Sequence, residues 1–366
     1  MDKNAPEYYK QLSLKEIHEK VRHVKKKNPQ EKQNIITYSR NFTLSLSNFC
    51  RNNCKYCYYN HRIPKPPENE NVTLLGQKKV AKQMRQGKEF ECKEALIMSG
   101  EKPSTFPEVK QKLEESGYKS FMEYVKEVCL AALENNLLPH INIGIMSYRE
   151  LKQLKEYNAS MGLMLESTGD ALFKEGGVHE HSPGKKPKVR IEHIKNAGKL
   201  KIPFTTGLLI GIGETFEERV NDLFLIKEIH ENYGHIQEVI IQNFECKKRV
   251  SYKPKETISM KEMLKITGIA KLIFNNAIAV QVPPNLIQGF EEQFLSMGID
   301  DFGGISPFSQ DFINPEKEWP KIEHLEKICQ RNGLVLKERL PIYKKYVDKP
   351  GFCSERIKKI LKAIKI

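Results

Sequence analysis

The sequence predicts an α/β fold that is built around a parallel β-sheet. Short apolar segments rich in β-branched residues recur along the 366-residue chain, and amphipathic helical patterns separate them. Alternation of strand and helix is typical of parallel sheets, because each parallel connection needs a long crossover. The length suits one (β/α) barrel-like domain with extensions and allows a sizeable hydrophobic core.

Six segments are expected to form the strands of this sheet, and helix caps mark the helices between them. The expected strands are residues 42–47, 95–98, 141–143, 163–165, 204–210 and 239–241. Ser147, Thr215 and Ser259 each precede a glutamate by three positions, which is the spacing of a capping box. Gly198 and Gly234 stand where helices are expected to end.

The chain is expected to consist of a barrel and three flanking segments. Residues 1–40 read as a charged helical preface, in which Ser13 and Glu16 have capping-box spacing. Residues 41–289 are expected to form the barrel, residues 290–347 to cover its open end, and residues 348–366 to form a basic tail. The longest loops, 58–75, 102–118 and 171–189, follow the C-terminal ends of strands, where such barrels place their active sites.

Three cysteines follow the first expected strand with the spacing C-x3-C-x2-C: Cys50, Cys54 and Cys57. Thiolates this close on one loop can bind three corners of a cubic iron–sulfur cluster and leave its fourth iron without a protein ligand. A structural zinc site normally takes four ligands, usually from two separated pairs. A disulfide is not expected, because the chain has no secretory segment. We therefore expect a 4Fe–4S cluster with an open iron.

This motif, with the aromatic Tyr56 before its last cysteine, resembles the signature of the radical S-adenosylmethionine (SAM) superfamily. The resemblance implies that the open iron binds the amino and carboxylate groups of SAM. It implies that one electron from the reduced cluster, supplied by an external donor, releases a 5′-deoxyadenosyl radical. It also implies a partial (β/α)6 TIM-like barrel, which the six expected strands match.

The superfamily resemblance assigns further residues to SAM binding. Gly100 and Glu101, at the exit of the second strand, match the GE motif of the superfamily, and Tyr56 is expected to lie beside them. Glu166, at the end of the fourth strand, is expected to contact the ribose or the amino group. Arg190 is expected to pair with the SAM carboxylate, with an ordinary surface role as an equal alternative.

The fifth strand contains the expected adenine site. Gly207, Leu209 and Gly211 match the pattern G-x-I-x-G, although Leu209 stands where the pattern has isoleucine. Glycines there would let a flat adenine lie against the backbone. Glu214 is expected to serve the turn, and a tight strand-to-helix loop capped by Thr215 is compatible with the same residues.

Several stretches outside these motifs resemble the CofG family of deazaflavin (7,8-didemethyl-8-hydroxy-5-deazariboflavin) synthase subunits. The stretches are residues 203–215, 242–244 with Lys247, 284–286, 300–307, and 314–316 with Trp319 and Pro320. The resemblance runs from about residue 40 to residue 347, and Tyr59 departs from the expected phenylalanine. It implies that a sister radical SAM subunit, CofH, joins a tyrosine-derived 4-hydroxybenzyl group to a ribitylaminouracil. The present chain would then cyclise this adduct with loss of ammonia.

Polar side chains suit the polyhydroxylated pyrimidine that this resemblance implies as substrate. Four amides offer paired donors and acceptors to a uracil edge and to ribityl hydroxyls: Asn142, Gln242, Asn243 and Asn285. His140 shares a strand face with Asn142 and is expected to line the pocket, with a structural role as the alternative. Asp300 and Asp301 are expected to assist proton transfer, with an acidic turn as an equal alternative.

The net charge and the apolar content bound the remaining possibilities. The net charge of +14 comes from 60 basic and 46 acidic residues, but the basic residues are scattered among glutamates along helices. We therefore expect a solvated surface rather than a nucleic-acid interface. No apolar run approaches the roughly 20 residues of a membrane span, and the amino terminus lacks a signal region. A cytoplasmic protein without membrane contact is expected.

Other functions remain open on the sequence alone. Another small-molecule radical SAM enzyme, such as the sister subunit or a biotin-synthase-like enzyme, is the nearest rival. The five isolated cysteines offer no spacing for a second cluster, and Cys129 lies on an apolar helical stripe and is expected in the core. A tRNA-modifying radical SAM enzyme has only the net charge in its favour. A non-catalytic iron–sulfur protein would carry a cluster that ignores SAM.

Overall fold

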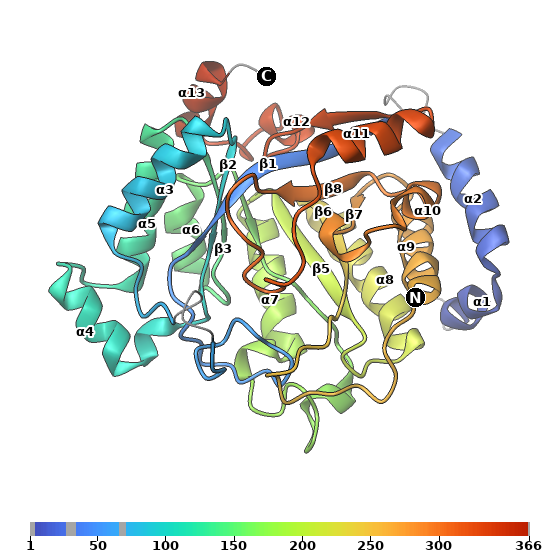
Figure 1. Cartoon of the computed structure of the whole chain (residues 1–366), viewed down its shortest axis with the longest axis horizontal. Helices are drawn as coiled ribbons and strands as arrows, with labels where there is room; N and C mark the ends of the chain where they lie inside the picture. Colours follow the sequence, from blue (N-terminus) through green and yellow to red (C-terminus); the bar gives the residue numbers. More distant parts are fainter. Residues whose placement is uncertain (1–3, 27–33, 66–70, 365–366) are drawn as a thin grey trace.

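The structure, a computed structural model, describes residues 4–26, 34–65 and 71–364. Within these residues one nine-stranded sheet forms, and all its pairings are parallel. The strands are β1 (Ile35–Ser45), β2 (Glu94–Met98), β3 (Leu138–Asn142), β4 (Ser160–Gly162), β5 (Phe204–Ile210), β6 (Ile236–Asn243), β7 (Ala279–Gln281), β8 (Asp301–Ile305) and β9 (Val335–Glu338). They follow the order β2-β3-β4-β5-β6-β7-β8-β1-β9, and a further β1–β2 pairing closes the ring (Figure 1). The predicted TIM-like α/β barrel is confirmed.

The ring contains eight strands, two more than the partial (β/α)6 barrel has. β7 and β8 supply the additional strands, and β1 closes the ring because its 11 residues pair with β8 and β9 in one half and with β2 in the other. The sequence pattern does not reveal β7, which has three residues. β8 was hidden because Gly303 and Gly304 interrupt it, and glycine is depleted in strands.

Helices cover the outside of the ring. They are α1 (Ala5–Gln11), α2 (Leu14–Lys26), α3 (Gln77–Glu89), α4 (Pro107–Glu115), α5 (Phe121–Glu134), α6 (Tyr148–Lys155), α7 (Pro187–Lys199), α8 (Phe216–Tyr233), α9 (Met260–Phe274), α10 (Glu291–Ser296), α11 (Ile322–Arg331), α12 (Lys344–Val347) and α13 (Glu355–Ala363). The preface helices α1 and α2 pack on α8 and α9. The four-segment division of the chain stays a prediction. β1 begins at Ile35, inside the predicted preface, and β8 and β9, inside the predicted cover, belong to the sheet.

The local predictions for the segments between strands are mostly confirmed. Ser147, Thr215 and Ser259 form capping boxes at the starts of α6, α8 and α9. Ser13 makes the same reciprocal bonds with Glu16. Gly234 ends α8 in the left-handed conformation at φ 60°, as helix C-caps commonly do.

Three local predictions are wrong. The fourth strand was expected at residues 163–165 but lies at 160–162, because these are the residues that pair with β3 and β5. The expected loop 102–118 contains α4, which starts at Pro107 and buries two apolar side chains. Gly198 lies inside α7, where a Cβ atom would come within 2.6 Å of Tyr233, so it makes room for α8.

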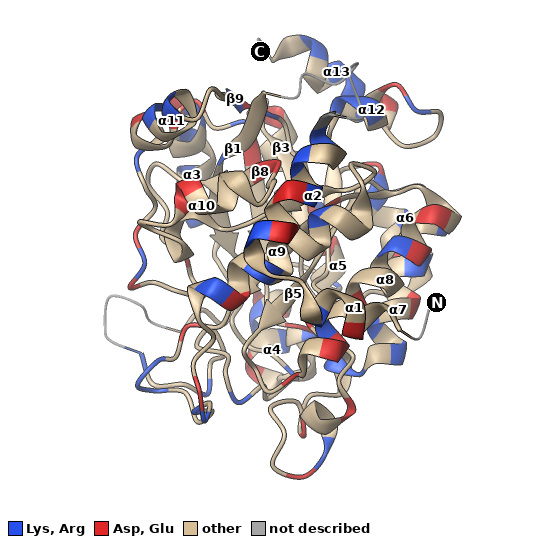
Figure 2. Ribbon diagram, turned by 90° about the vertical axis from the view of Figure 1, so that its right-hand side faces the viewer, with Lys and Arg blue, Asp and Glu red and all other residues tan. Residues whose placement is uncertain are grey.

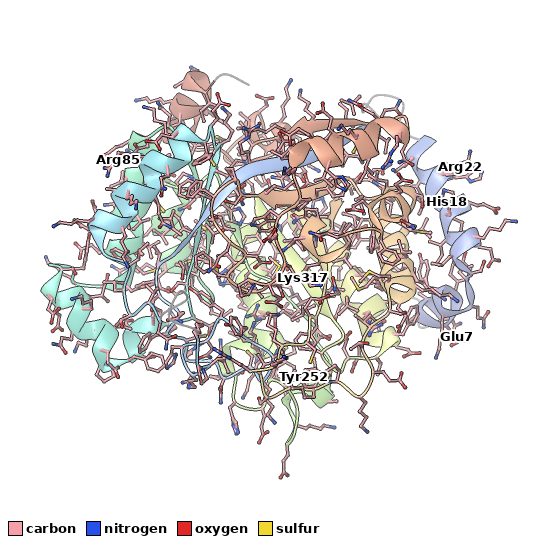
Figure 3. The ribbon with its side chains drawn as sticks, viewed as in Figure 1. Glu7, His18, Arg22, Arg85, Tyr252 and Lys317 are labelled. Atoms are coloured by element: carbon pink, nitrogen blue, oxygen red, sulfur yellow. The ribbon has the colours of Figure 1, made fainter. Side chains whose placement is uncertain are left out.

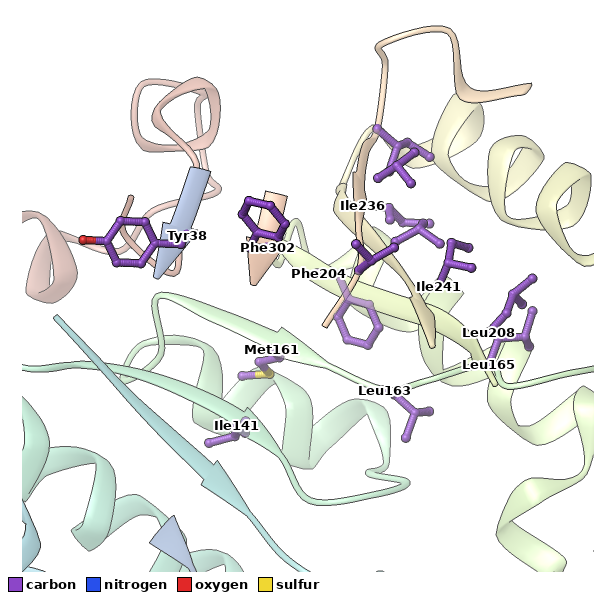
Figure 4. Close-up of a cluster of buried hydrophobic side chains, with 14 of the residues drawn as sticks. Tyr38, Ile141, Met161, Leu163, Leu165, Phe204, Leu208, Ile236, Ile241 and Phe302 are labelled. Carbon is purple, nitrogen blue, oxygen red and sulfur yellow. The ribbon is translucent and has the colours of Figure 1, made fainter. Parts of the chain in front are cut away.

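Alternation along the strands separates an outer apolar layer from a polar interior. Ile141, Met161 and Phe204 occupy neighbouring positions of β3, β4 and β5 and are fully buried (Figure 4). The residues beside them in the chain, among them His140 and Thr205, face the cavity inside the ring instead. The core prediction for Cys129 is confirmed, because its thiol is buried among apolar side chains. Burial between sheet and helices therefore stabilises the barrel without filling its centre.

Charged side chains cover the outer faces of the helices. Lysines and arginines alternate with acidic residues along the helices seen in Figure 2. The side chains of Glu7, His18 and Arg22 project outward from α1 and α2, as Figure 3 shows. Among the described residues, no helix combines the length and the apolar character that crossing a membrane would need.

A buried ion network closes the barrel at the amino-terminal ends of the strands. Arg339 donates to Asp301 Oδ1 at 2.9 Å and to Glu238 Oε2 at 2.7 Å. Tyr343 donates to Glu238 Oε2 at 3.0 Å, and Thr205 Oγ1 donates to Glu238 Oε1 at 2.8 Å. Two carboxylates can stay buried here because one guanidinium offers them several hydrogen bonds at once. Outside the network, α12 and α13 pack over the same end of the barrel, at the top of Figure 1.

We predict that Arg339→Ala lowers the free energy of unfolding by about 3 to 5 kcal/mol, because it leaves two buried carboxylates without their cation. Arg331→Ala is the matched control, since Arg331 and its partner Glu292 are 64% and 50% exposed. That control should change stability by no more than about 1 kcal/mol. Urea denaturation of the apoprotein measures both, and equal effects would contradict the role given to the network.

Candidate active site

A cavity of about 380 Å³ lies inside the barrel and extends to the loops after its strands. Thirteen of the residues predicted for the site line it: Cys50, Cys54, Tyr56, Cys57, Gly100, Glu101, His140, Asn142, Glu166, Arg190, Leu209, Gln242 and Asn243. Five predicted residues do not line it: Gly207, Gly211, Asn285, Asp300 and Asp301. The fold thus brings most of the predicted site together from six different strands and the loops that follow them.

Backbone hydrogen bonds fix the cysteine loop against three neighbouring segments. Arg51 N donates to Glu101 O at 3.0 Å, which ties the loop to the end of β2. Lys55 N donates to Val178 O at 3.0 Å, and Tyr252 N donates to Lys55 O at 2.9 Å. The three thiols are therefore held by the chain itself, as preorganised metal ligands require.

The surroundings of the thiols suit thiolates that bind metal. Glu101 N donates to Cys50 Sγ at 3.2 Å, and Ser182 Oγ donates to Cys54 Sγ at 3.3 Å. Burial raises the pKa of all three thiols, to about 12 for Cys54, and the cation of Lys185 opposes part of that rise at Cys54 and Cys57. Bound iron would supply the positive charge that burial makes necessary.

The three thiols line one common cavity. No group of three His, Cys, Asp or Glu side chains in the described ranges is placed to hold one metal ion. In a four-iron cluster each thiolate binds a different iron at a corner of the cube, so the thiols must be spread around a space. Cys50, Cys54 and Cys57 all line one cavity and so fit that requirement.

Gly100 brings the end of β2 into contact with the cysteine loop. A Cβ atom at Gly100 would clash with the carbonyl oxygen of Phe49 and would lie 2.9 Å from Cys50 Cβ. Gly100 N also donates to Ser47 O at 2.7 Å. The glycine of the GE motif therefore permits the close approach of two backbones.

Glu101 is held in one position beside the cysteines. Its carboxylate accepts from Arg51 Nε at 2.7 Å and from Ile145 N at 3.1 Å. Gly144 and Gly184 make room for it, because a Cβ atom at either position would collide with the carboxylate. Burial alone would raise the pKa of Glu101, but Arg190 and Arg51 hold that pKa below its usual value. The side chain is therefore an ionised, fixed acceptor at the wall of the cavity.

Glu166 lies at the centre of a second buried network. Its carboxylate accepts hydrogen bonds from Lys185 and Tyr56, and His179 Nε2 lies 3.3 Å away. Its backbone adopts φ 65°, which turns the side chain into the cavity. Burial alone would raise the pKa of Glu166, but Lys185 and Arg190 hold it well below the usual value. Glu166, the predicted SAM contact, is therefore already paired with protein side chains.

Arg190 is buried and contacts backbone carbonyls. Its Nε donates to Gly184 O at 3.2 Å, and Nη1 donates to Met164 O. The alternative of an ordinary surface role is wrong, because the residue is 3% exposed. The guanidinium lines the cavity together with Glu101 and Glu166, whose pKa values it lowers.

Gly207 of β5 and Gly211, which follows the strand, allow close backbone packing and do not line the cavity. A Cβ atom at Gly207 would lie 2.5 Å from Ile240 O, so this glycine allows β5 and β6 to approach. Gly211 has φ 96°, which favours glycine, and a Cβ atom there would meet Ile258 at 3.3 Å. Only Leu209 of this pattern lines the cavity. Glu214 serves the turn, as expected, since it accepts from Gly211 N at 2.7 Å.

The predicted substrate contacts divide into paired and unpaired groups. His140 shares a 2.6 Å hydrogen bond with Ser160 Oγ, and burial lowers its pKa to about 3, so its ring is neutral. Asn243 Nδ2 donates to Glu245 Oε1 at 2.5 Å. Asn142 and Gln242 line the cavity, and neither side chain has a hydrogen-bond partner among the described residues.

Asn285 and the two aspartates do not line the cavity. Asn285 Nδ2 donates to Asp311 Oδ2 at 3.0 Å in the segment that covers the barrel. Asp300 pairs with Lys271 at 2.5 Å and accepts from Val280 N at 2.9 Å. Asp301 belongs to the Arg339 network, and both aspartates stand at the amino-terminal end of β8. The predicted acidic turn is therefore a strand start, held by ion pairs.

The segment 306–320, which follows β8 in the sequence, lies across the cavity. Residues 311–314 and Trp319 line the cavity. Lys247 Nζ donates to Asn314 Oδ1 at 2.7 Å, and Lys317, labelled in Figure 3, pairs with Glu245 at 3.2 Å. These contacts join the segment to the loop after β6, so the cavity is covered on that side.

Lys185 is the main site residue that sequence reasoning missed. The charge pattern predicts solvated basic side chains in general, yet the side chain of Lys185 is 13% exposed and pairs with Glu166. The available signal was its place in the loop 171–189, which follows a strand's C-terminal end. Asn52, inside the cysteine motif, was also missed, and it accepts from Gly184 N at 2.8 Å.

Comparison with known proteins gives the same family from two directions. The model of the Radical SAM superfamily matches residues 44–226. The 7,8-didemethyl-8-hydroxy-5-deazariboflavin synthase of Methanococcus maripaludis is 49% identical over 329 residues, which cover 89% of this chain and 96% of the relative. The protein of the same name from Methanocaldococcus jannaschii is 46% identical over 361 residues, which cover 98% of this chain and 96% of the relative.

Solved structures share the fold at low sequence identity. Methylornithine synthase superposes with a TM-score of 0.68 at 17% identity, covering 91% of this chain and 93% of its own. The FeFe-hydrogenase maturase HydG of Carboxydothermus hydrogenoformans gives 0.71 at 16% identity, covering 94% and 80%. The superfamily uses a 4Fe–4S cluster and SAM, which the thiol donors described above suit. The chain belongs to the radical SAM superfamily and, within it, to the family of 7,8-didemethyl-8-hydroxy-5-deazariboflavin synthases.

Proposed function

We propose that this chain closes the deazaflavin ring. Its substrate is the adduct of a 4-hydroxybenzyl group with ribitylaminouracil, and the reaction releases ammonia and 5′-deoxyadenosine. The observation that supports this proposal is one covered cavity. Three thiols line it together with amides that have no partner in the described residues, such as Asn142 and Gln242. Radical ring closure needs a metal site and a polar substrate site in the same enclosed space.

Each group of site residues has a proposed role. Cys50, Cys54 and Cys57 hold the cluster, which when bound supplies the electron that cleaves SAM to methionine and a 5′-deoxyadenosyl radical. Glu101 and Glu166 are ionised acceptors for the amino and ribose groups of SAM. Lys185 and Arg190 balance these carboxylates, and a SAM carboxylate beside them would gain a cationic partner.

The remaining partners follow from the proposed chemistry. A separate sister radical SAM subunit makes the adduct, because joining the tyrosine fragment and closing the ring are two radical events. An external donor would reduce the cluster before the first turnover. Ring closure removes a hydrogen atom, a proton and one further electron from the adduct, and that electron would return to the cluster. We place the chain in the cytoplasm, because reduced iron–sulfur clusters need a reducing compartment.

The cysteine assignment predicts that Cys54→Ser lowers the iron content, because loss of one thiolate leaves two anchors for the cluster. Cys246→Ser is the matched control, since Cys246 is the exposed thiol of the described residues and should keep full iron. Iron quantitation after anaerobic reconstitution measures both variants. Normal iron and SAM cleavage in the Cys54→Ser protein would sink the assignment.

The close packing at Gly100 predicts that Gly100→Ala also lowers the iron content, because the added methyl group would push the cysteine loop away from β2. Gly76→Ala should change nothing, since no atom lies within 4 Å of the added Cβ and the backbone conformation is ordinary. The absorbance of the reconstituted cluster, per folded chain, is the readout. A full cluster in Gly100→Ala would show that the contact is not required.

The division of labour predicts that the purified chain, with SAM and reductant, forms no deazaflavin from free tyrosine and ribitylaminouracil. It should form the fluorescent product from the preassembled adduct, with 5′-deoxyadenosine as coproduct. Cys54→Ser serves as the negative control for both reactions. Product from the free precursors would refute the division, and SAM cleavage without conversion of the adduct would refute the proposed reaction.

A further inference from the structure

The deep end of the cavity contains two amides that no part of the sequence analysis used. Asn41 of β1 and Gln281 of β7 both line the cavity and flank β8. Between them, Gly303 and Gly304 of β8 leave the space open, because a Cβ atom at either glycine would collide with one of the amides. The two carboxamides therefore have an unobstructed position on the inner wall.

These amides are buried and have no protein partner. Asn41 is 4% exposed and Gln281 is 7% exposed, and neither side chain makes a hydrogen bond within the described residues. The polar atoms of both carboxamides are open to the cavity, since neither residue is among the described ones with a fully enclosed, unpartnered polar atom. Such groups persist in native proteins where a ligand or an ordered water completes them. Their burial inside the cavity points to a ligand there.

A carboxyl group beside Asn41 extends the same polar surface. Glu94 stands opposite Asn41 in the β1–β2 ladder and lines the cavity. One of its oxygens accepts from Ser39 Oγ at 2.5 Å, and the other has no partner in the described part of the chain. Burial raises the pKa of Glu94 to about 7, so near neutral pH the carboxyl group can donate as well as accept.

The polar surface lies at the closed end of the cavity. Asn41 stands four residues before the end of β1, which at about 3.3 Å per residue places it roughly 13 Å along the strand from the end that leads to the cysteine loop. The Arg339 network, itself fully hydrogen-bonded, seals the barrel beneath it. Between the two ends the wall is mixed, with the apolar side chains of Leu96, Leu163 and Ile240 beside Thr43 and His140. The apolar part of the wall therefore lies between the cysteine loop and the amides of the closed end.

We propose that Asn41, Gln281 and Glu94 bind the hydroxyl groups of the substrate's ribityl chain. This proposal rests on the proposed function. The reacting ring atoms must lie near the thiols and SAM, so the chain attached to the pyrimidine extends toward the closed end. Each hydroxyl both donates and accepts, as a carboxamide and a protonated carboxyl group do. The flat ring system can pack against the apolar side chains of the wall, such as Leu96 and Ile240.

The test compares two substrates in wild type and variants. One is the ribityl adduct, and the other is the same adduct with a methyl group in place of the ribityl chain. Gln281→Leu and Asn41→Ala should each raise KM for the ribityl adduct about fivefold to tenfold, which is the effect of one lost hydrogen bond. Their KM for the methyl adduct should stay unchanged, so the preference for the ribityl adduct shrinks. Asn232→Ala, an exposed amide on α8, is the control and should keep the preference.

The outcomes separate this proposal from the proposed function. Iron content and SAM cleavage without substrate should be normal in the variants, which excludes misfolding, and the two variants lie on different strands. Equal losses with both adducts, or no loss with either, would overturn the ribityl assignment while conversion by wild type upholds the proposed function. If wild type converts neither adduct, titration of free ribitylaminouracil and of its methyl analogue decides the ribityl site alone. Tighter binding of the ribityl compound that Gln281→Leu abolishes would support it, and equal binding would refute it.

Discussion

The contact between the cysteine loop and the end of β2 is the constraint on which the site depends. Gly100 lets two backbones meet where a side chain would keep them apart, and Glu101 N reaches Cys50 Sγ as a result. The same residue's carboxylate is then fixed by Arg51 of the cysteine loop. One close approach therefore sets the positions of a thiol, of its hydrogen-bond donor and of an ionised acceptor, and the loop 171–189 packs onto this assembly through Val178.

Closure at the other end makes an empty interior possible. TIM barrels normally fill their centres with side chains, whereas this barrel keeps a cavity of about 380 Å³. Its stability comes from the layer between sheet and helices, where Ile141, Met161 and Phe204 pack. The Arg339 network closes the barrel at the amino-terminal ends of the strands. Such a network costs desolvation, so it is retained for shape more than for stability.

The sequence could predict the features that depend on local chemistry. Cysteine spacing, capping boxes and the limits of β5 need only neighbours along the chain, and they agree with the structure. It could not predict β7 and β8, because a three-residue strand and a Gly-Gly strand owe their pairing to β1 and β6. Nor could it predict that Lys185 is buried, since only folding brings Glu166 to it. Gly198 and Gly207 were misread for the same reason, because their roles are set by Tyr233 and Ile240 from other elements.

Strand alternation explains why such a barrel can change its interior without losing its fold. Along β3, β4 and β5, outward residues carry the apolar packing, while His140, Ser160 and Thr205 face inward. An inward side chain such as Asn41 makes no hydrogen bond with the outer layer in the described residues, so it can change to suit a ligand without loss of that layer's packing. Inward residues that other charged groups need, such as Glu238, are the exception. Stability and recognition therefore occupy opposite faces of the same strands, and the two meet only at the closed end of the cavity.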